Sequence, residues 1–136
     1  MSEKPLLSAT APGVVTMTSP YAVDETVDRM KTVIHSMGLT LFAHIDHGGN
    51  AERAGLLMQS AHLLIFGNPL IGTPLMVASP LLALDLPLKV LVWQEQAAWT
   101  RVSYNSISYL AKRHALSEDL SNTLVRIDDL VAMALK

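Results

Sequence analysis

The sequence contains no cysteine, and charge of neither sign dominates it. Disulfide bonds, thiolate metal sites and cysteine nucleophiles are therefore excluded. Ten Lys and Arg residues against twelve Asp and Glu residues leave a net charge of -2, and the basic residues form no run. Nucleic-acid binding normally needs a basic patch that neutralises phosphates, so we expect no nucleic-acid partner.

Long apolar runs are also missing. The longest apolar stretch, residues 81–93, is interrupted by Asp85, Pro87 and Lys89. A membrane-spanning helix needs about 20 consecutive apolar residues, which this stretch does not supply. The first 17 residues have no apolar core typical of a signal peptide. We therefore expect no membrane partner and a cytoplasmic protein, and no motif predicts a cofactor.

What the sequence does contain is enough apolar material for one core. Half of its 136 residues are hydrophobic and only 16% are charged, which argues against disorder. This length is typical of a single domain, and no internal repeat or low-complexity linker divides it. We expect a flexible N-terminal segment over residues 1–13 and one domain over residues 14–136.

The pattern of elements indicates an α+β fold. Strands are predicted at residues 14–18, 39–47, 61–67, 86–93 and 99–104. The clearest helix has one apolar stripe, at Val23, Val27, Met30, Ile34 and Met37. Short helices are predicted from Asn50, from Thr73-Pro74 and after Asn105, and a final one starts after Ser117 with a stripe at Leu120, Leu124, Ile127 and Val131. This order favours an antiparallel or mixed sheet of about five strands with helices mainly on one face.

The strand at residues 86–93 is apolar on both faces. Its even-numbered positions are all Leu or Val, and Pro87, Leu91 and Trp93 make the other face largely apolar too. An antiparallel sheet with one wet face alternates more clearly than this. The second face is therefore expected to be covered, either by the protein's own helices or by a partner chain. We favour the partner, and hence a homodimer.

Six short motifs occur in an order that resembles a known family. They are SPY (19–21), FAHIDH (42–47), LIFGNP (64–69), GTPLM (72–76), DLPLK (85–89) and SYN (103–105). Together they resemble the domain-of-unknown-function 302 family from about residue 14 to 116. The resemblance implies an α+β fold similar to the TATA-binding-protein-like group, assembled as a homodimer. It implies no activity, and similarity of fold does not carry DNA binding with it.

The most suggestive polar cluster is His44, Asp46 and His47. On a strand, His44 and His47 point to opposite faces and do not share a metal ion without a bulge, so no metal is predicted. His47, oriented by Asp46, has the chemistry of an acid or base near neutral pH. We favour the alternative, a structural histidine that closes the strand by hydrogen bonding into the turn.

Three further residues are candidate ligand contacts. Lys89 is an unusual cation in an apolar strand: it either binds an anion, pairs with Asp46 on a neighbouring strand, or lies along apolar surface. Asn68 precedes a possible anion-binding helix start, although we favour a structural turn at this position. Tyr104 is a potential hydrogen-bond donor to a ligand.

Three functions remain compatible with these residues. The first is a small-molecule binding or sensing homodimer whose pocket is lined by Asp46, His47, Asn68, Lys89 and Tyr104. The second is an enzyme that uses His47 as acid or base and Lys89 to stabilise negative charge. The third is a protein-interaction subunit in which these side chains are structural. We favour the first.

Overall fold

The computed structural model describes residues 10–96 and 98–136. The flexible segment expected at residues 1–13 therefore falls mostly outside the described residues, as does Ala97 in the turn between the last two strands. The elements, in chain order, are β1 (Val14–Ser19), α1 (Val23–Ser36), β2 (Thr40–Asp46), α2 (His47–Arg53), β3 (Ala61–Gly67), α3 (Pro69–Ala78), the 3-10 helix η1 (Pro80–Leu84), β4 (Leu88–Gln94), β5 (Thr100–Asn105), α4 (Ile107–Arg113), α5 (Glu118–Ser121) and α6 (Ile127–Ala134).

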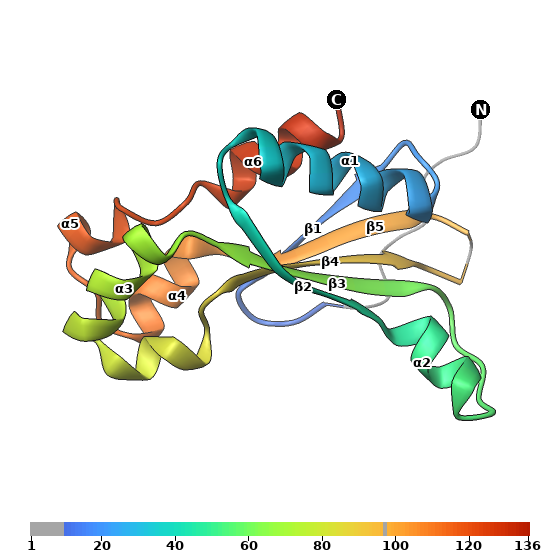
Figure 1. The fold of residues 1–136 in the computed structure, drawn as a ribbon, viewed down its shortest axis with the longest axis horizontal. Coiled ribbons are helices and arrows are strands. Elements are labelled where there is room, and N and C mark those ends of the chain that lie inside the picture. Colours follow the sequence, from blue (N-terminus) through green and yellow to red (C-terminus); the bar gives the residue numbers. More distant parts are fainter. Residues whose placement is uncertain (1–9, 97) are drawn as a thin grey trace.

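The five strands form a single antiparallel sheet, which confirms the predicted α+β class. Their order across the sheet is β1-β5-β4-β3-β2, so β4 is the central strand. Helices α1 and α6 lie against one face of the sheet, as Figure 1 shows. Helices α3, α4 and α5 with η1 gather at one end of the strands, and α2 projects from the other end. No helix in the described residues is long and apolar enough to cross a membrane.

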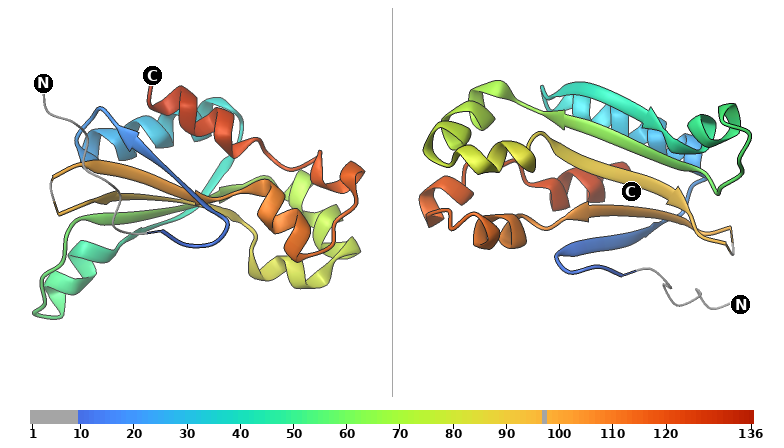
Figure 2. Two further views of the ribbon diagram at one scale, coloured as in Figure 1. Left: turned by 180° about the vertical axis from the view of Figure 1, so that it is seen from behind. Right: turned by 90° about the horizontal axis from the view of Figure 1, so that it is seen from below.

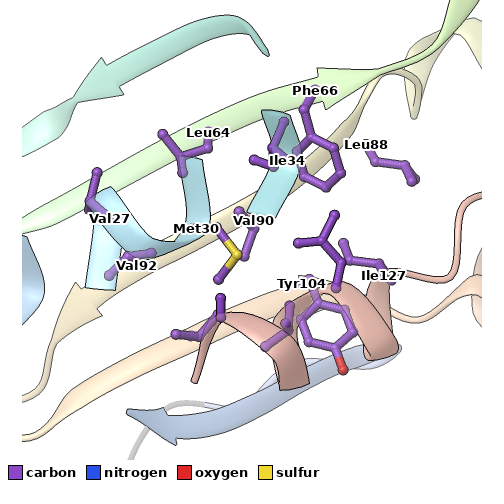
Figure 3. Packing of buried hydrophobic residues seen from close by; sticks show 14 of the residues in the cluster. Val27, Met30, Ile34, Leu64, Phe66, Leu88, Val90, Val92, Tyr104 and Ile127 are labelled. Atoms are coloured by element: carbon purple, nitrogen blue, oxygen red, sulfur yellow. The ribbon is translucent and has the colours of Figure 1, made fainter. Parts of the chain in front are cut away.

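The main core lies between the sheet and helices α1 and α6 (Figure 3). Of the stripe predicted for the first helix, Met37 is instead the C-cap of α1 and is 40% exposed. The other stripe residues, Val23, Val27, Met30 and Ile34, are all buried. They meet Leu64 and Phe66 of β3, Val90 and Val92 of β4, and Ile127, Leu130 and Val131 of α6. The apolar residues repeat at helical spacing, and the side of the helix that they form packs against the sheet, as the sequence indicated.

The final helix is divided, contrary to the single stripe expected after Ser117. Helix α5 ends at Ser121 and α6 begins at Ile127. Leu124, between them, packs with Leu75 and Leu82 in a second small cluster, whereas Ile127 joins the main core. The apolar residues of this stretch therefore pack in two different clusters, and one straight helix would not reach both.

The second face of the sheet, called the open face below, has no helix over it in the described part of the chain (Figures 1 and 2). Strand register and alternation place apolar side chains of β2, β3 and β4 there, and the polar side chains lie on β1 and β5 except for Lys89 on β4. The set is Ala43, Ile45, Leu63, Ile65, Lys89, Leu91, Trp93, Arg101, Ser103, Thr16 and Thr18. The central strand is thus apolar on both faces, as predicted.

Candidate functional site

An apolar pocket lies where β2 and β3 meet α3 and the start of β4. Its volume is about 140 Å³. The lining comes from four segments that are distant in sequence: Phe42; Gly67, Asn68, Pro69, Ile71, Gly72, Thr73 and Met76; Leu86, Pro87 and Leu88; and Leu124 and Val125. No Asp, Glu, His, Lys, Arg or Tyr is among these lining residues. The pocket therefore offers apolar contact with few polar anchors.

A β-bulge places Phe42 at the pocket. Leu41 pairs with Phe66 and Ala43 pairs with Ile65, so Phe42 has no partner residue on β3. The extra residue shifts the alternation of the strand. As a result His44 and Asp46 share the face covered by α1, while Phe42 is left 48% exposed beside Gly67.

Gly67 and Gly72 leave space in the pocket because they have no side chain. A Cβ on Gly67 would lie 3.6 Å from Pro87 Cβ, and one on Gly72 would lie 3.8 Å from both Leu86 and Met76. Both distances are ordinary contacts, so the missing side chains leave space that neighbours do not fill. Both glycines belong to motifs noted in the sequence, LIFGNP and GTPLM, but nothing in the sequence indicated that they line a pocket.

Helix α3 begins earlier than Thr73-Pro74 predicted. Asn68 is its N-cap, with Oδ1 accepting a hydrogen bond from Leu70 N at 2.9 Å, and Pro69 occupies the first turn. The N–H groups of Ile71 and Gly72 donate to Asn68 O. These donors are used within the helix, so Asn68 has the structural role that the sequence left open as an alternative to anion binding.

The other four candidate residues lie away from this pocket. Asp46 and His47 are at the start of α2, beyond the opposite end of β2. Lys89 lies on the open face and donates from Nζ to Pro87 O at 3.0 Å. Tyr104 faces the helices, where its hydroxyl donates to Asp128, and burial together with Asp128 raises its pKa. Of the five candidates, Asn68 alone lines the pocket.

The helix α2 also starts earlier than expected, because Asp46 rather than Asn50 caps it. Asp46 Oδ1 accepts a hydrogen bond from Gly49 N at 2.9 Å, and this bond is the main reason that the pKa of Asp46 is lowered. A Cβ on Gly49 would lie 2.4 Å from Asp46 Oδ2. The Gly48-Gly49 pair thus lies within the helix because glycine leaves room for the cap.

Asp46 also belongs to a histidine cluster with His44 and His62. The two imidazoles lie 2.9 Å apart, from His44 Nε2 to His62 Nδ1, and Asp46 Oδ1 lies 4.0 Å from His62 Nδ1. Strand β3 separates Asp46 from Lys89, and the two residues occupy opposite faces, so the suggested pairing between them is wrong. No group of three or more ligating side chains placed to hold a metal occurs among the described residues.

The histidine cluster predicts a pH-dependent contribution to stability. Burial, followed by Lys31 and His62, lowers the pKa of His44 below its ordinary value of 6.5. The folded state therefore disfavours protonated His44. Its free energy of unfolding should fall as pH drops through 6.5, the value for the unfolded chain, towards the lower pKa of the folded state.

Urea unfolding between pH 8 and pH 5, roughly spanning the range in which histidine titrates, measures this effect. We expect His44→Gln to flatten the slope, and His35→Gln, at an exposed position late in α1, serves as the matched substitution for comparison. Equal slopes for the wild type and His44→Gln would contradict the assignment.

A second polar cluster joins residues that the sequence did not connect. His114 Nε2 and Asp85 Oδ2 lie 2.5 Å apart, and Arg113 Nη1 donates to the same carboxylate at 3.1 Å. Asp85 caps the end of η1 and His114 caps the end of α4. The cluster therefore ties two helix ends together at the side of the fold that holds the pocket.

Comparisons with known proteins place these features in a wider context. The profile of the family described as "Domain of unknown function DUF302" matches residues 15–134. The protein named fluoride-specific ion channel FluC 1 from Brucella suis biovar 1 is 38% identical over 112 residues, which are 82% of this chain and 44% of that protein. The protein named fluoride-specific ion channel FluC 2 from Brucella melitensis biotype 1 is also 38% identical over 112 residues, which are 42% of that protein. The chain thus spans less than half the length of these relatives.

The fold has a counterpart among solved structures. The crystal structure of an uncharacterized conserved protein from Bacillus stearothermophilus superposes with a TM-score of 0.75 and 19% sequence identity. The match covers 92% of this chain and 97% of that one. The similarity therefore concerns the whole α+β domain rather than a local motif.

Proposed function

This chain belongs to the DUF302 family, whose description assigns no function, and we propose that it is a small-molecule-binding domain that acts as a homodimer. The observation that carries ligand binding is the apolar pocket of about 140 Å³ between Phe42, α3 and Pro87. A dry apolar cavity of about 150 Å³ is known to accept benzene. The ligand class is therefore a molecule, or part of one, on the scale of a single aromatic ring.

The lining favours binding over acid/base catalysis. Catalytic acids and bases must reach the reacting group, and neither His47 nor Lys89 is among the residues that line this pocket. The polar groups that do line it are the Asn68 amide and the Thr73 hydroxyl. Such a site orients a mainly apolar molecule by one or two hydrogen bonds.

The open face supports the homodimer. Its central residues Leu63, Ile65 and Leu91 are apolar and half-buried in the single chain. Three of its polar side chains are already bonded to one another: Trp93 Nε1 donates to Ser103 Oγ at 2.8 Å, and Ser103 Oγ lies 2.8 Å from Thr16 Oγ1. A face whose polar groups are satisfied internally loses little when water is excluded from it.

Native mass spectrometry of the protein as purified from cells tests both parts of the proposal. We expect the mass of a dimer, together with a reproducible additional mass for the bound molecule. A fluorinated benzyl alcohol, followed by fluorine NMR, serves as a defined probe of the pocket. A dimer without added mass and without probe binding would overturn the ligand assignment, and a monomer would overturn the dimer.

Filling the pocket should abolish binding without unfolding the domain. In Gly72→Leu the new side chain starts 3.8 Å from Leu86 and Met76 and must enter the pocket, so we expect probe affinity to fall at least about 10-fold. Ala78→Leu adds the same side chain at an exposed position of α3 that does not line the pocket. Equal loss of affinity in both variants would place the probe elsewhere.

A second proposal follows from the Brucella relatives, which are named fluoride-specific ion channels and are more than twice as long as the matched part. We propose that the domain acts as an accessory subunit in fluoride resistance. Cells that lack it should grow less well in fluoride, and the wild-type chain should restore growth while Gly72→Leu does not. Unchanged growth of the deletion strain in fluoride would reject this role.

A further inference from the structure

Two apolar surfaces lie at opposite ends of the strands. The first is the arm tip, residues 56–58 after α2, where Leu56, Leu57 and Met58 are 65%, 95% and 52% exposed. The second is η1, where Leu81 and Leu84 are 73% and 72% exposed. Clusters of exposed apolar side chains are unusual on a monomeric surface and mark contact sites.

Both surfaces project on the side of the open face. In Figure 1, α2 and η1 extend beyond the sheet in the direction away from α1 and α6. The right-hand view of Figure 2, which looks onto the open face, places α2 beyond one end of the strands and η1 beyond the other. The open face therefore lies between two apolar projections, one at each end of the strands.

The size of the open face leaves room for the projections to contribute to a dimer interface. Five strands about 4.8 Å apart and six to seven residues long, at about 3.3 Å per residue, outline roughly 400 Å². A standard interface buries about 800 Å² on each partner. The outline of the sheet is about half of that value, and the apolar surface of the raised ends would add to the interface.

Two-fold symmetry brings the two projections together. A dimer interface of this kind is isologous, so each contact occurs twice. A two-fold axis that runs in the plane of the open face, across the strands near Leu91, reverses the ends of the partner's strands. The arm tip of each chain then lies over η1 of the other.

We propose that a second copy of this chain docks on the open face with its arm tip seated on η1, so that each subunit clasps the other. This inference rests on the homodimer proposed above and adds its geometry. It also places the partner's Leu57 beside the segment that continues into Leu86 and Pro87, which line the ligand pocket. The pocket is then supported from the other subunit.

The absence of cysteine permits a clean cross-linking test. One batch of full-length chain carries Leu57→Cys and another carries Leu84→Cys; the two are unfolded, mixed, refolded and treated with a short bismaleimide. We expect a covalent dimer whose cross-linked peptide joins positions 57 and 84. Leu57→Cys mixed with Met133→Cys, an exposed site on α6, is the control and should give none.

The outcomes separate the clasp from the dimer. A dimer by native mass without the 57–84 cross-link would overturn the clasp and leave the homodimer standing, whereas a monomer would overturn both. Leu57→Ser gives an independent measurement. Because Leu57 is 95% exposed in the single chain, this variant should fold normally, and its dimer dissociation constant should rise about 100-fold as two buried leucines are lost. An unchanged constant would also overturn the clasp.

Discussion

Replacing Glu95 with alanine is expected to lower the free energy of unfolding by about 3 to 5 kcal/mol. Glu95 and Arg101 are 6% and 1% exposed, and Arg101 Nη2 donates to Glu95 Oε2 at 3.1 Å. Arg101 also donates to Thr18 Oγ1, and its guanidinium carbon lies 5.6 Å from the centre of the Trp99 ring. Removing the carboxylate leaves a buried cation without this counter-charge.

Urea denaturation of Glu95→Ala, Arg101→Met and the paired variant Glu95→Leu with Arg101→Met measures this effect. The pair should recover most of the loss, because two apolar side chains leave no buried charge behind. A large coupling energy between the two positions identifies the ion pair as the cause. A cost below about 1 kcal/mol for Glu95→Ala, typical of solvent-screened pairs, would contradict the prediction.

Replacing Leu91 with aspartate is expected to convert the proposed homodimer into a monomer. Leu91 is the middle residue of the central strand and faces the open side, between Leu63 and Ser103. In an isologous dimer two new carboxylates would be buried close to the symmetry axis and to each other. Desolvation and mutual repulsion should raise the dimer dissociation constant at least about 1,000-fold, equivalent to about 4 kcal/mol.

Analytical ultracentrifugation over a concentration series reads this constant directly. Met133→Asp is the matched control, because Met133 is an exposed apolar residue on α6, on the side of the sheet away from the open face. It should leave the dimer intact. If Leu91→Asp remained dimeric while keeping its helical circular dichroism, the interface would have to lie on another surface, and the clasp would fail with it.

The elements that periodicity predicted well are those in which local and tertiary preferences agree. Helix α1 has one apolar stripe that packs against one apolar face, so four of the five predicted stripe residues are buried, and Met37, just after the helix, is not. The helix starts were less accurate because caps compete: Asn68 and Asp46 accept backbone hydrogen bonds ahead of Thr73 and Asn50. The bulge at Phe42 had no signal in the sequence, since it depends on how β2 registers with β3.

For the candidate site, too, the sequence predicted some features and not others. The sequence identified Asn68 and the motifs that contain Gly67 and Gly72, but it could not show that they line one pocket. The contact of His44 with His62, and of Asp85 with His114, joins residues 18 and 29 positions apart. Such contacts are decided by strand pairing and helix packing, which spacing along the chain does not encode.

By itself, the sequence determined the α+β class, the doubly apolar central strand and the family resemblance, because composition, alternation and short motifs are properties of the chain. Only the tertiary structure decided which polar side chains meet. It separated Asp46 from Lys89 by inserting β3 between their strands, and it turned Tyr104 towards Asp128. It also revealed the apolar pocket, whose walls come from four distant segments that adjoin only after the sheet and α3 have packed.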